Sequence, residues 1–318
     1  MDTIIVATDF SKAALNASKY AAALAAELKA HLIIVHIIEV PLAPLPMPLT
    51  AVEFEEIEKS VSAQLAETKE QLLFYTNNRI NIITEIKYGF AETALENLYK
   101  QHPAIAIVVG LRSNAPASKP FLGSTALRIL PYLDCPVLII PEKAVFAGIK
   151  NIVIASDSEQ IRENTTIESI KNWLSYFHVQ PDLVHVNTEE DTGLKTLSGN
   201  VFLHNRFSSF SPRFHSIHSK NVDDGIFGFL EQKKTDLLIV VPGKYSFLRQ
   251  LFHASHSKQL ILHSHLPVLA VPSRKAHSIK KQNDISDTDN TKKCAGCDGL
   301  CCSDKQVAEN QKTGATLK

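Results

Sequence analysis

The chain repeats its own pattern once, and this duplication constrains the fold more than any other feature of the sequence. Several segments of the first half recur in the same order in the second, roughly 145 residues later. The pairs are TIIVATDFSK and NIVIASDSEQ, HLIIVHII and PDLVHVN, AIAIVVGLRS and DLLIVVPGKYS, and DCPVLIIP and HLPVLAVP. This period is much longer than that of a solenoid repeat, so the sequence predicts two copies of one domain, at residues 1–145 and 149–273.

Short apolar runs alternate with helical patterns along the first copy. Ser11 is a candidate N-cap for a helix that continues to about Lys29, and Thr50 with Glu53 forms a capping box for a longer helix. The apolar runs are nearly continuous, which is typical of strands covered on both faces of a parallel sheet. They lie at 3–8, 32–38, 80–86, 104–109 and 136–140. The alternation predicts an α/β domain with helices on both faces of a parallel sheet.

The fourth of these runs leads into a stretch with the features of an anion site. Gly110 follows the run, a loop of small and polar residues comes next, and Gly123-Ser124-Thr125 opens a helix. N–H groups at a helix start bind anions, glycines let a ligand approach the main chain, and hydroxyls add further donors. The stretch therefore favours phosphate as its ligand.

The spacing of this stretch resembles the nucleotide motif of the universal stress protein family. That motif has glycine, two residues, glycine, nine residues, glycine, and then serine or threonine. Gly110, Ser113, Gly123 and Ser124 stand at these positions, and Ser113 replaces the second glycine. A serine resists a left-handed backbone, so binding weakens if the position requires one. The resemblance covers residues 1 to about 143 well and residues 149 to about 273 more faintly.

The resemblance implies two tandem doubly wound domains, each with a five-stranded parallel sheet in the order 3-2-1-4-5. In that order the first and fourth strands are neighbours at the point where the chain reverses direction, which is where ligands bind. Asp9 and Gly110 would then meet at one cleft although they are far apart in sequence. Family members pair through their last strand, so residues 137–140 and 268–271 are expected to associate within the chain as a pseudo-dimer, with a homodimer as the alternative.

The resemblance also implies which residues of the first copy contact an adenine nucleotide. From the adenine end to the phosphates these are Thr8, Asp9, Ile37, Gly110, Ser113, Gly123, Ser124 and Thr125. The expected ligand is ATP, ADP or AMP, with Mg²⁺ as a candidate companion ion. Structural interpretations remain open beside these roles: Asp9 and Ser124 can cap helices, and Ile37 can be a core residue.

No catalytic arrangement accompanies the motif. The sequence has no Walker lysine motif, no glycine-rich dinucleotide fingerprint after its first strand and no nucleophile elbow. Hydrolysis needs a placed base and usually a metal held by a carboxylate, and Asp9 is the acidic residue that the sequence puts at the cleft. The sequence therefore favours a nucleotide-binding stress-response regulator, with slow ATP hydrolysis at most. An enzyme that makes or breaks an adenylate bond is the less favoured alternative.

The second copy departs from the motif. Gly243 and Ser246 match Gly110 and Ser113, but Ala254-Ser255-His256 stands where the first copy has glycine, serine and threonine. Without the glycine, the approach of a phosphate to the main chain is obstructed. The second copy is therefore expected to serve packing and pairing rather than nucleotide binding.

Composition excludes several classes of protein. Lys and Arg number 33, Asp and Glu also number 33, and no apolar run is long enough to span a bilayer. The balance of charge gives no reason to expect nucleic acid or a membrane surface as partner. The start of the chain lacks the basic segment of an export signal, so a cytoplasmic protein is expected.

Residues 274–318 lose the apolar period and are expected to be a disordered tail. The tail contains CAGCDGLCC, and the thiols of Cys294, Cys297, Cys301 and Cys302 suit a soft ion such as Zn²⁺ or Cu(I). A free, solvated thiol cluster is an equally open interpretation. The alternative function is accordingly an interaction module that needs no nucleotide and whose cysteine-rich tail binds metal or senses redox state.

Overall fold

The computed structural model describes residues 2–39, 51–111, 128–130, 132–155, 161, 163–187, 201–220, 222–241 and 265–273. Contacts divide the chain into two units, Met1–Ala276 and His277–Lys318. All described residues belong to the first unit.

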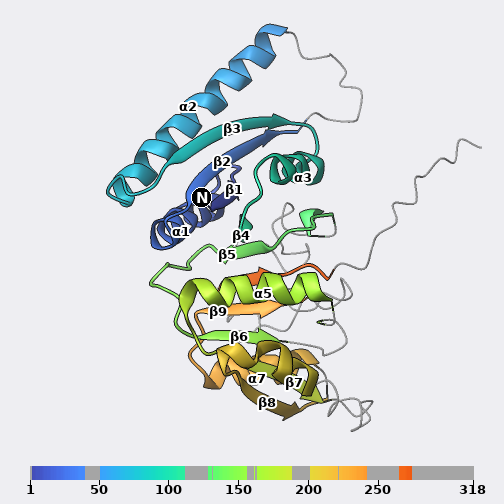
Figure 1. The fold of residues 1–318 in the computed structure, drawn as a ribbon. Helices are drawn as coiled ribbons and strands as arrows, with labels where there is room; N and C mark the ends of the chain where they lie inside the picture. The colour runs from blue at the N-terminus through green and yellow to red at the C-terminus, as the bar shows by residue number, and fades with distance from the viewer. Residues whose placement is uncertain are drawn as a thin grey trace, which may run out of the picture. The chain divides into compact units, whose positions relative to one another are not determined.

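Ten strands form one sheet, whose order consists of the same five-strand pattern twice (Figure 1). The first half contributes β1 (Thr3–Ala7), β2 (His31–Ile38), β3 (Ile82–Tyr88), β4 (Ala106–Leu111) and β5 (Val137–Pro141). The second half contributes β6 (Ile152–Ala155), β7 (Asp182–Asn187), β8 (Arg213–His218), β9 (Leu237–Val240) and β10 (Val268–Ala270). The order is β3-β2-β1-β4-β5-β10-β9-β6-β7-β8. The predicted α/β class and the order 3-2-1-4-5 are thus confirmed in the first half, and the second half repeats that order.

The two halves of the sheet join through their last strands. Neighbouring strands are parallel within each half, whereas β5 and β10 pair antiparallel with Leu138 opposite Leu269. Both leucines are fully buried. The halves therefore share one continuous sheet.

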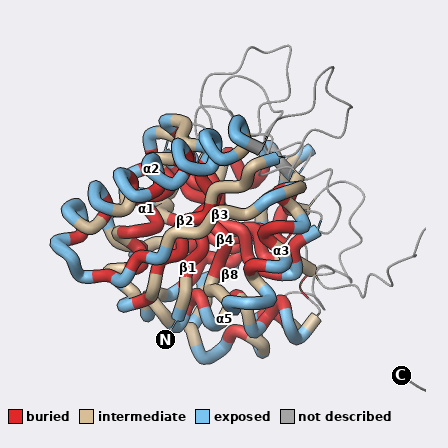
Figure 2. Tube along the Cα trace, turned by 90° about the horizontal axis from the view of Figure 1, so that it is seen from above, coloured by how far each residue is buried: buried red, intermediate tan, exposed pale blue. Residues whose placement is uncertain are grey.

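Helices cover both faces of this sheet. Apolar residues of α1 (Lys12–Leu28), α2 (Ala51–Tyr75) and α5 (Asn164–Phe177) pack against one face. Those of α3 (Ala91–Gln101) and α7 (Val222–Gln232) pack against the other. Figure 2 shows the buried segments concentrated in the strands and on the inner sides of the helices. Across the described ranges, none of the helices combines the length and apolar character that crossing a membrane requires.

The first helix forms as its sequence predicts. Ser11 is the N-cap, and its Oγ accepts a hydrogen bond from the Ala14 N–H at 3.3 Å. At the other end Lys29 adopts a left-handed conformation with φ 53° and donates its N–H to the Ala25 carbonyl. The buried side of α1 is mostly alanine, so the helix can lie close to the sheet.

Two strands are displaced from their predicted positions. β3 covers Ile82–Tyr88 rather than 80–86, and β4 covers Ala106–Leu111 rather than 104–109. Pairing with neighbours decides both, because β3 pairs with β2 as far as Tyr88 and β4 pairs with β5 as far as Leu111. Gly110 consequently lies inside its strand and not after it.

Candidate functional site

The strand order reverses direction at β1, which pairs with β2 on one side and with β4 on the other. Val6 lies opposite Val108, so two residues further along Thr8 and Gly110 reach the same level of the sheet. The Thr8 N–H donates to the Val35 carbonyl at 2.9 Å, which continues the pairing with β2 beyond the end of β1. In doubly wound sheets this carboxyl edge is where ligands bind.

The turn after β1 is held by its own side chains. Thr8 Oγ1 accepts the Phe10 N–H at 3.0 Å, and Asp9 Oδ1 accepts the Ser11 N–H at 3.0 Å. Thr8 is buried, whereas Asp9 is exposed. Asp9 therefore has the capping role at the start of α1 that the sequence left open. It also lies at the same edge of the sheet as Gly110.

Phe10 has an unusual backbone conformation in this turn. Its φ is 57°, which is uncommon for a residue with a bulky side chain. The ring stacks on His36 with centroids 4.7 Å apart and planes inclined by 17°. His36 Nδ1 lies 2.8 Å from the Thr8 carbonyl oxygen, and because a carbonyl only accepts, Nδ1 carries the hydrogen. Backbone strain of this kind tends to occur at functional sites.

Gly110 is required by the packing of α1 against β4. A Cβ at this position would stand 2.5 Å from the Ala13 carbonyl oxygen and 2.8 Å from the Ala14 nitrogen. These are backbone atoms of the first turn of α1, so they cannot rotate away. The glycine thus lets the start of α1 lie directly against the strand. This role was missed from the sequence, and the approach of Gly110 to a ligand stays a prediction.

Ile37 lies within β2, opposite Lys87 of β3. Its side chain is half-buried and packs on the core beneath α3. Ile37 therefore does contribute to the core, which is the structural role that the sequence left open. A contact between its backbone and adenine stays a prediction.

Arg128 ties together three segments at the carboxyl edge. Its Nη1 lies 2.7 Å from Glu39 Oε1, and its Nη2 lies 2.9 Å from Glu92 Oε2. Glu39 follows β2 and Glu92 is in the first turn of α3, while Arg128 comes directly after the segment 112–127. The hydrogen bond to Glu39 raises the pKa of Arg128, partial burial opposes this, and the hydrogen bond to Glu92 adds to it. Arg128 was not among the predicted site residues, although its place four residues after Ser124 puts it in the helix expected after the motif.

Other residues of the sequence motifs lie outside the described part of the chain. These are Ser113, Gly123, Ser124 and Thr125 of the first half, Gly243, Ser246 and Ala254-Ser255-His256 of the second, and Cys294, Cys297, Cys301 and Cys302 of the tail. Within the described ranges, no group of three or more His, Cys, Asp or Glu side chains is placed to hold a metal ion. The structure thus describes Thr8, Asp9, Ile37 and Gly110 of the predicted nucleotide site.

Residues 1–141 match the family model described as the universal stress protein family. A universal stress protein from Archaeoglobus fulgidus has a similar structure, with TM-score 0.64 and 16% identity, covering 86% of this chain and 97% of that one. A putative universal stress protein from Pseudomonas aeruginosa has TM-score 0.49 and 10% identity, covering 86% of this chain and 93% of that one.

A third structure, a universal stress protein in complex with cAMP, has TM-score 0.32 and 23% identity, covering 45% of this chain and 98% of that one. Comparison with curated proteins gave no match. The similarity to the Archaeoglobus fulgidus protein extends over both halves of the chain and shows that they share its fold.

Proposed function

Because residues 1–141 match the model of the universal stress protein family, we propose that this half of the chain binds an adenine nucleotide at the carboxyl edge of β1 and β4. In this proposal the chain is a stress-response regulator and not a catalyst. ATP is the leading ligand, with ADP and AMP as the alternatives, and Mg²⁺ would accompany the phosphates as a counter-ion.

One observation carries the proposal: Thr8, Asp9 and Gly110 all lie at the carboxyl edge of β1 and β4, where the strand order reverses direction. Asp9 is exposed there, and a carboxylate oxygen can accept a hydrogen bond from a ribose hydroxyl. The backbone of Ile37 at the neighbouring strand would face the adenine edge. Adenine and ribose would therefore lie over β1 and β2.

The phosphates would lie beyond Gly110, on the segment that follows β4. Gly110 begins the spacing that continues to Ser113 and Gly123-Ser124-Thr125, whose N–H and hydroxyl groups would hold them. Arg128 supports this assignment. It is the residue that directly follows that segment, and its ion pairs with Glu39 and Glu92 hold it at the same edge of the sheet.

A regulatory role is proposed in preference to catalysis because of the chemistry at this edge. Glu39 and Glu92 are both engaged by Arg128, and Asp9 accepts the Ser11 N–H. A hydrolase would need a base that orients water and a carboxylate that holds a metal against the phosphates. The second half would act as a structural partner, and the β5–β10 pairing supports a pseudo-dimer within the chain.

The proposal is tested by calorimetry on the purified full-length protein with ATP, ADP and AMP. The expected result is binding at millimolar concentration or tighter, and a loss of at least tenfold in affinity in the Gly123→Val variant, whose side chain would obstruct the phosphates. Chromatography of the denatured protein should also release a co-purified adenine nucleotide.

Gly228→Val is the matched control, since Gly228 has no atom within 4 Å of an added Cβ and lies in α7, in the other half. It should leave binding unchanged. The proposal is wrong if none of the three nucleotides binds, or if Gly123→Val binds as the unmodified protein does.

A further inference from the structure

The edge strand β8 has features that the proposed nucleotide site does not use. It is the last strand of the sheet and pairs in parallel with β7 from Arg213 to His218. Its residues are exposed or half-buried, whereas those of β6, β9 and β10 are all buried. In the described part of the chain, no strand pairs with the outer side of β8.

Hydrogen bonds to β7 establish which backbone groups of β8 face outward. The Arg213 N–H donates to the Pro181 carbonyl at 2.9 Å, and the Ser219 N–H donates to the Asn187 carbonyl at 3.2 Å. Backbone groups point to alternate sides along a strand, so every second residue from Arg213 faces β7. Phe214, Ser216 and His218 therefore direct their N–H and C=O groups away from the sheet. An added strand pairs with groups in this arrangement.

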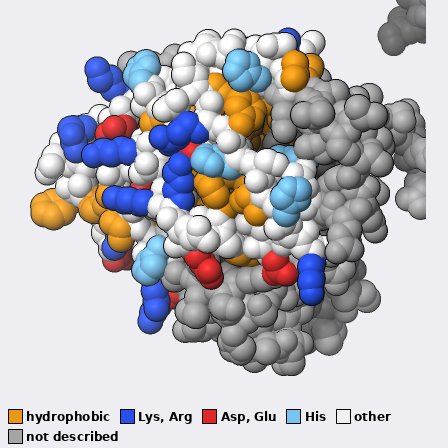
Figure 3. Space-filling view, turned by 90° about the horizontal axis from the view of Figure 1, so that it is seen from below, with side chains coloured by type: hydrophobic (Ala, Val, Ile, Leu, Met, Phe, Trp, Pro, Cys, Tyr) orange, Lys and Arg blue, Asp and Glu red, His pale blue; other side chains and the backbone are white. Residues whose placement is uncertain are grey.

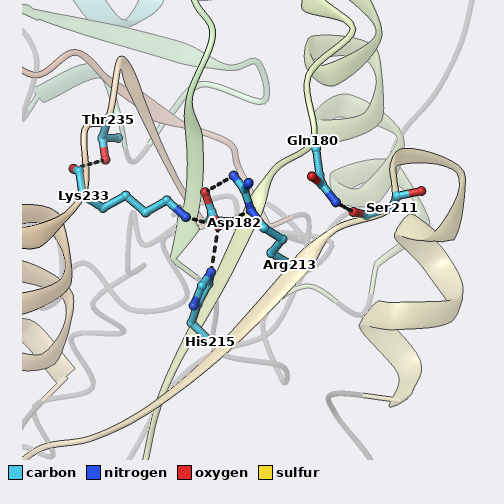
Figure 4. Close-up of polar contacts among 7 residues, drawn as sticks. All are labelled: Gln180, Asp182, Ser211, Arg213, His215, Lys233 and Thr235. Atoms are coloured by element: carbon cyan, nitrogen blue, oxygen red, sulfur yellow. Dashed lines mark hydrogen bonds and ion pairs between the residues drawn. The ribbon is translucent and has the colours of Figure 1, made fainter.

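A cluster of cationic side chains lies at the amino end of the same strand (Figure 4). Asp182 of β7, only 1% exposed, accepts hydrogen bonds from Arg213 at 2.8 and 2.9 Å. The same carboxylate is 2.7 Å from His215 Nε2 and 2.5 Å from Lys233 Nζ. One carboxylate thus faces two permanent cations and a histidine, so the cluster keeps a net positive charge. The Arg213 side chain is 47% exposed and presents this charge to solvent.

Aromatic side chains accompany the cations. Phe229 of α7 lies beside the His215 ring at 4.8 Å, and Lys233 Nζ is 5.6 Å from the centre of the Phe229 ring. On the other face of β8, Phe214 is 37% exposed and its ring lies 5.5 Å from His204. Figure 3 shows Lys, Arg and His side chains gathered around apolar ones on the lower side of the molecule, where Figure 1 has β8.

The corresponding edge strand of the first half differs. On β3 the cation Lys87 is paired with Glu85 at 2.7 Å, and Phe54 of α2 packs beside Tyr88 with ring centres 5.5 Å apart. The surplus of positive charge is therefore a property of β8 and does not follow from the duplicated fold.

We propose that β8 is a docking edge for an extended acidic segment of a partner protein, which adds to the sheet as a further strand. Backbone groups of Phe214, Ser216 and His218 would pair with the segment, and Arg213 and Lys233 would attract its carboxylates. A second copy of this chain is a poorer occupant, because β8 (Arg213–His218) contains no acidic residue that could face Arg213 and Lys233.

The test uses the full-length protein and a fluorescein-labelled seven-residue peptide that alternates Glu and Val, with binding followed by fluorescence anisotropy. Ser216→Pro removes one outward N–H and no hydrogen bond to β7, so it is compatible with an edge strand and should weaken binding at least tenfold. Ser216→Ala is the matched control: it also loses the 2.6 Å hydrogen bond from Asn187 Nδ2 but keeps the N–H, and it should bind normally. Lys233→Met should weaken binding severalfold.

A second measurement leaves the protein unchanged. A Glu-Val peptide with N-methylated amides on its pairing side should not bind, and a Lys-Val peptide should not bind either. The proposal is overturned if the Lys-Val peptide binds equally well, or if N-methylation has no effect. It is also overturned if Ser216→Pro dissolves a dimer seen by ultracentrifugation, or if a single-stranded oligonucleotide binds the edge more tightly than the peptide.

Discussion

Gly110 leaves no room for a side chain beside Ala13, because a Cβ on it would stand 2.5 Å from the Ala13 carbonyl oxygen. A glycine that opens a nucleotide motif is usually explained by the approach of the ligand to the main chain. In this chain the same glycine also sets the distance between α1 and β4. If the predicted approach of a nucleotide to Gly110 is correct, both demands fall on one residue, and a substitution there should be detected in stability as well as in binding.

Gly110→Ala should destabilise the protein by about 1–3 kcal/mol, the usual cost of forcing extra atoms into a packed interior. Urea unfolding followed by circular dichroism measures this. Gly228→Ala is the control, since nothing lies within 4 Å of its added Cβ and it is inside α7. That variant should gain about 0.5–1 kcal/mol from the better helix propensity of alanine. Equal unfolding midpoints for Gly110→Ala and the unmodified protein would refute the close packing.

Phe10 offers a test of the turn beside Asp9. Phe10→Gly and Phe10→Ala both lose the stacking on His36, but only glycine adopts a φ of 57° without strain. The glycine variant should therefore be more stable than the alanine variant by roughly 1 kcal/mol. At most positions the order is the reverse. Thermal unfolding of the two variants side by side makes the comparison, and a more stable alanine variant would mean that the left-handed turn is not maintained.

The fold could be predicted from the sequence because its signals are local and repeated. Apolar runs identified the strands, Ser11 identified the start of α1, and the duplication indicated that the strand order repeats in the second half. The boundaries of β3 and β4 were missed because pairing with neighbours, and not local composition, decides where those strands end. The placement of Asp9 and Gly110 at one edge of the sheet followed from the strand order that the resemblance implied.

The contacts that could not be predicted join residues far apart in sequence. Arg128 reaches Glu39 and Glu92 only after three elements have assembled. Asp182 meets Arg213 because the register of β7 against β8 places them opposite each other. No spacing in the sequence marks such partners. The conformation of Phe10 was missed for a different reason, since a positive φ is expected at glycine and not at an aromatic residue.

Asp182 should make the stability of the protein depend on pH in acid. Burial alone raises the pKa of Asp182, but hydrogen bonds from Arg213, Lys233 and His215 outweigh it and lower the pKa from 3.8 to about 2. Since the folded value is below the unfolded one, the stabilisation is complete at neutral pH and is lost as pH falls from about 5 towards 1. The shift corresponds to about 2 kcal/mol.

Urea unfolding at pH 7, 4 and 2.5 tests this dependence. Asp182→Asn should lose this part of the pH dependence and should cost about 2 kcal/mol at pH 7, because the cations that remain on Arg213 and Lys233 are partly exposed and can be hydrated. Arg213→Lys is the milder comparison: it keeps the charge but loses the two-pronged hydrogen bond, so it should retain the dependence with lower stability. An Asp182→Asn protein with the unmodified pH profile would exclude this carboxylate as the source.

Arg128 allows stability and binding to be separated. It and Glu39 are partly exposed, so Arg128→Ala should cost no more than about 1 kcal/mol in unfolding free energy. If the proposed nucleotide site is correct, the same variant should weaken ATP binding by about threefold to tenfold, because the residue after the phosphate segment is no longer fastened to Glu39 and Glu92. Arg128→Lys should lie between, since an ammonium lacks the planar fork that reaches two carboxylates. Calorimetry measures the ATP affinity of both Arg128 variants.

Lys100→Ala is the control, because it breaks an exposed pair with Glu96 within α3 and should leave ATP binding unchanged. An equal loss of affinity in Lys100→Ala would mean that surface charge, and not the anchoring of the segment by Arg128, governs binding.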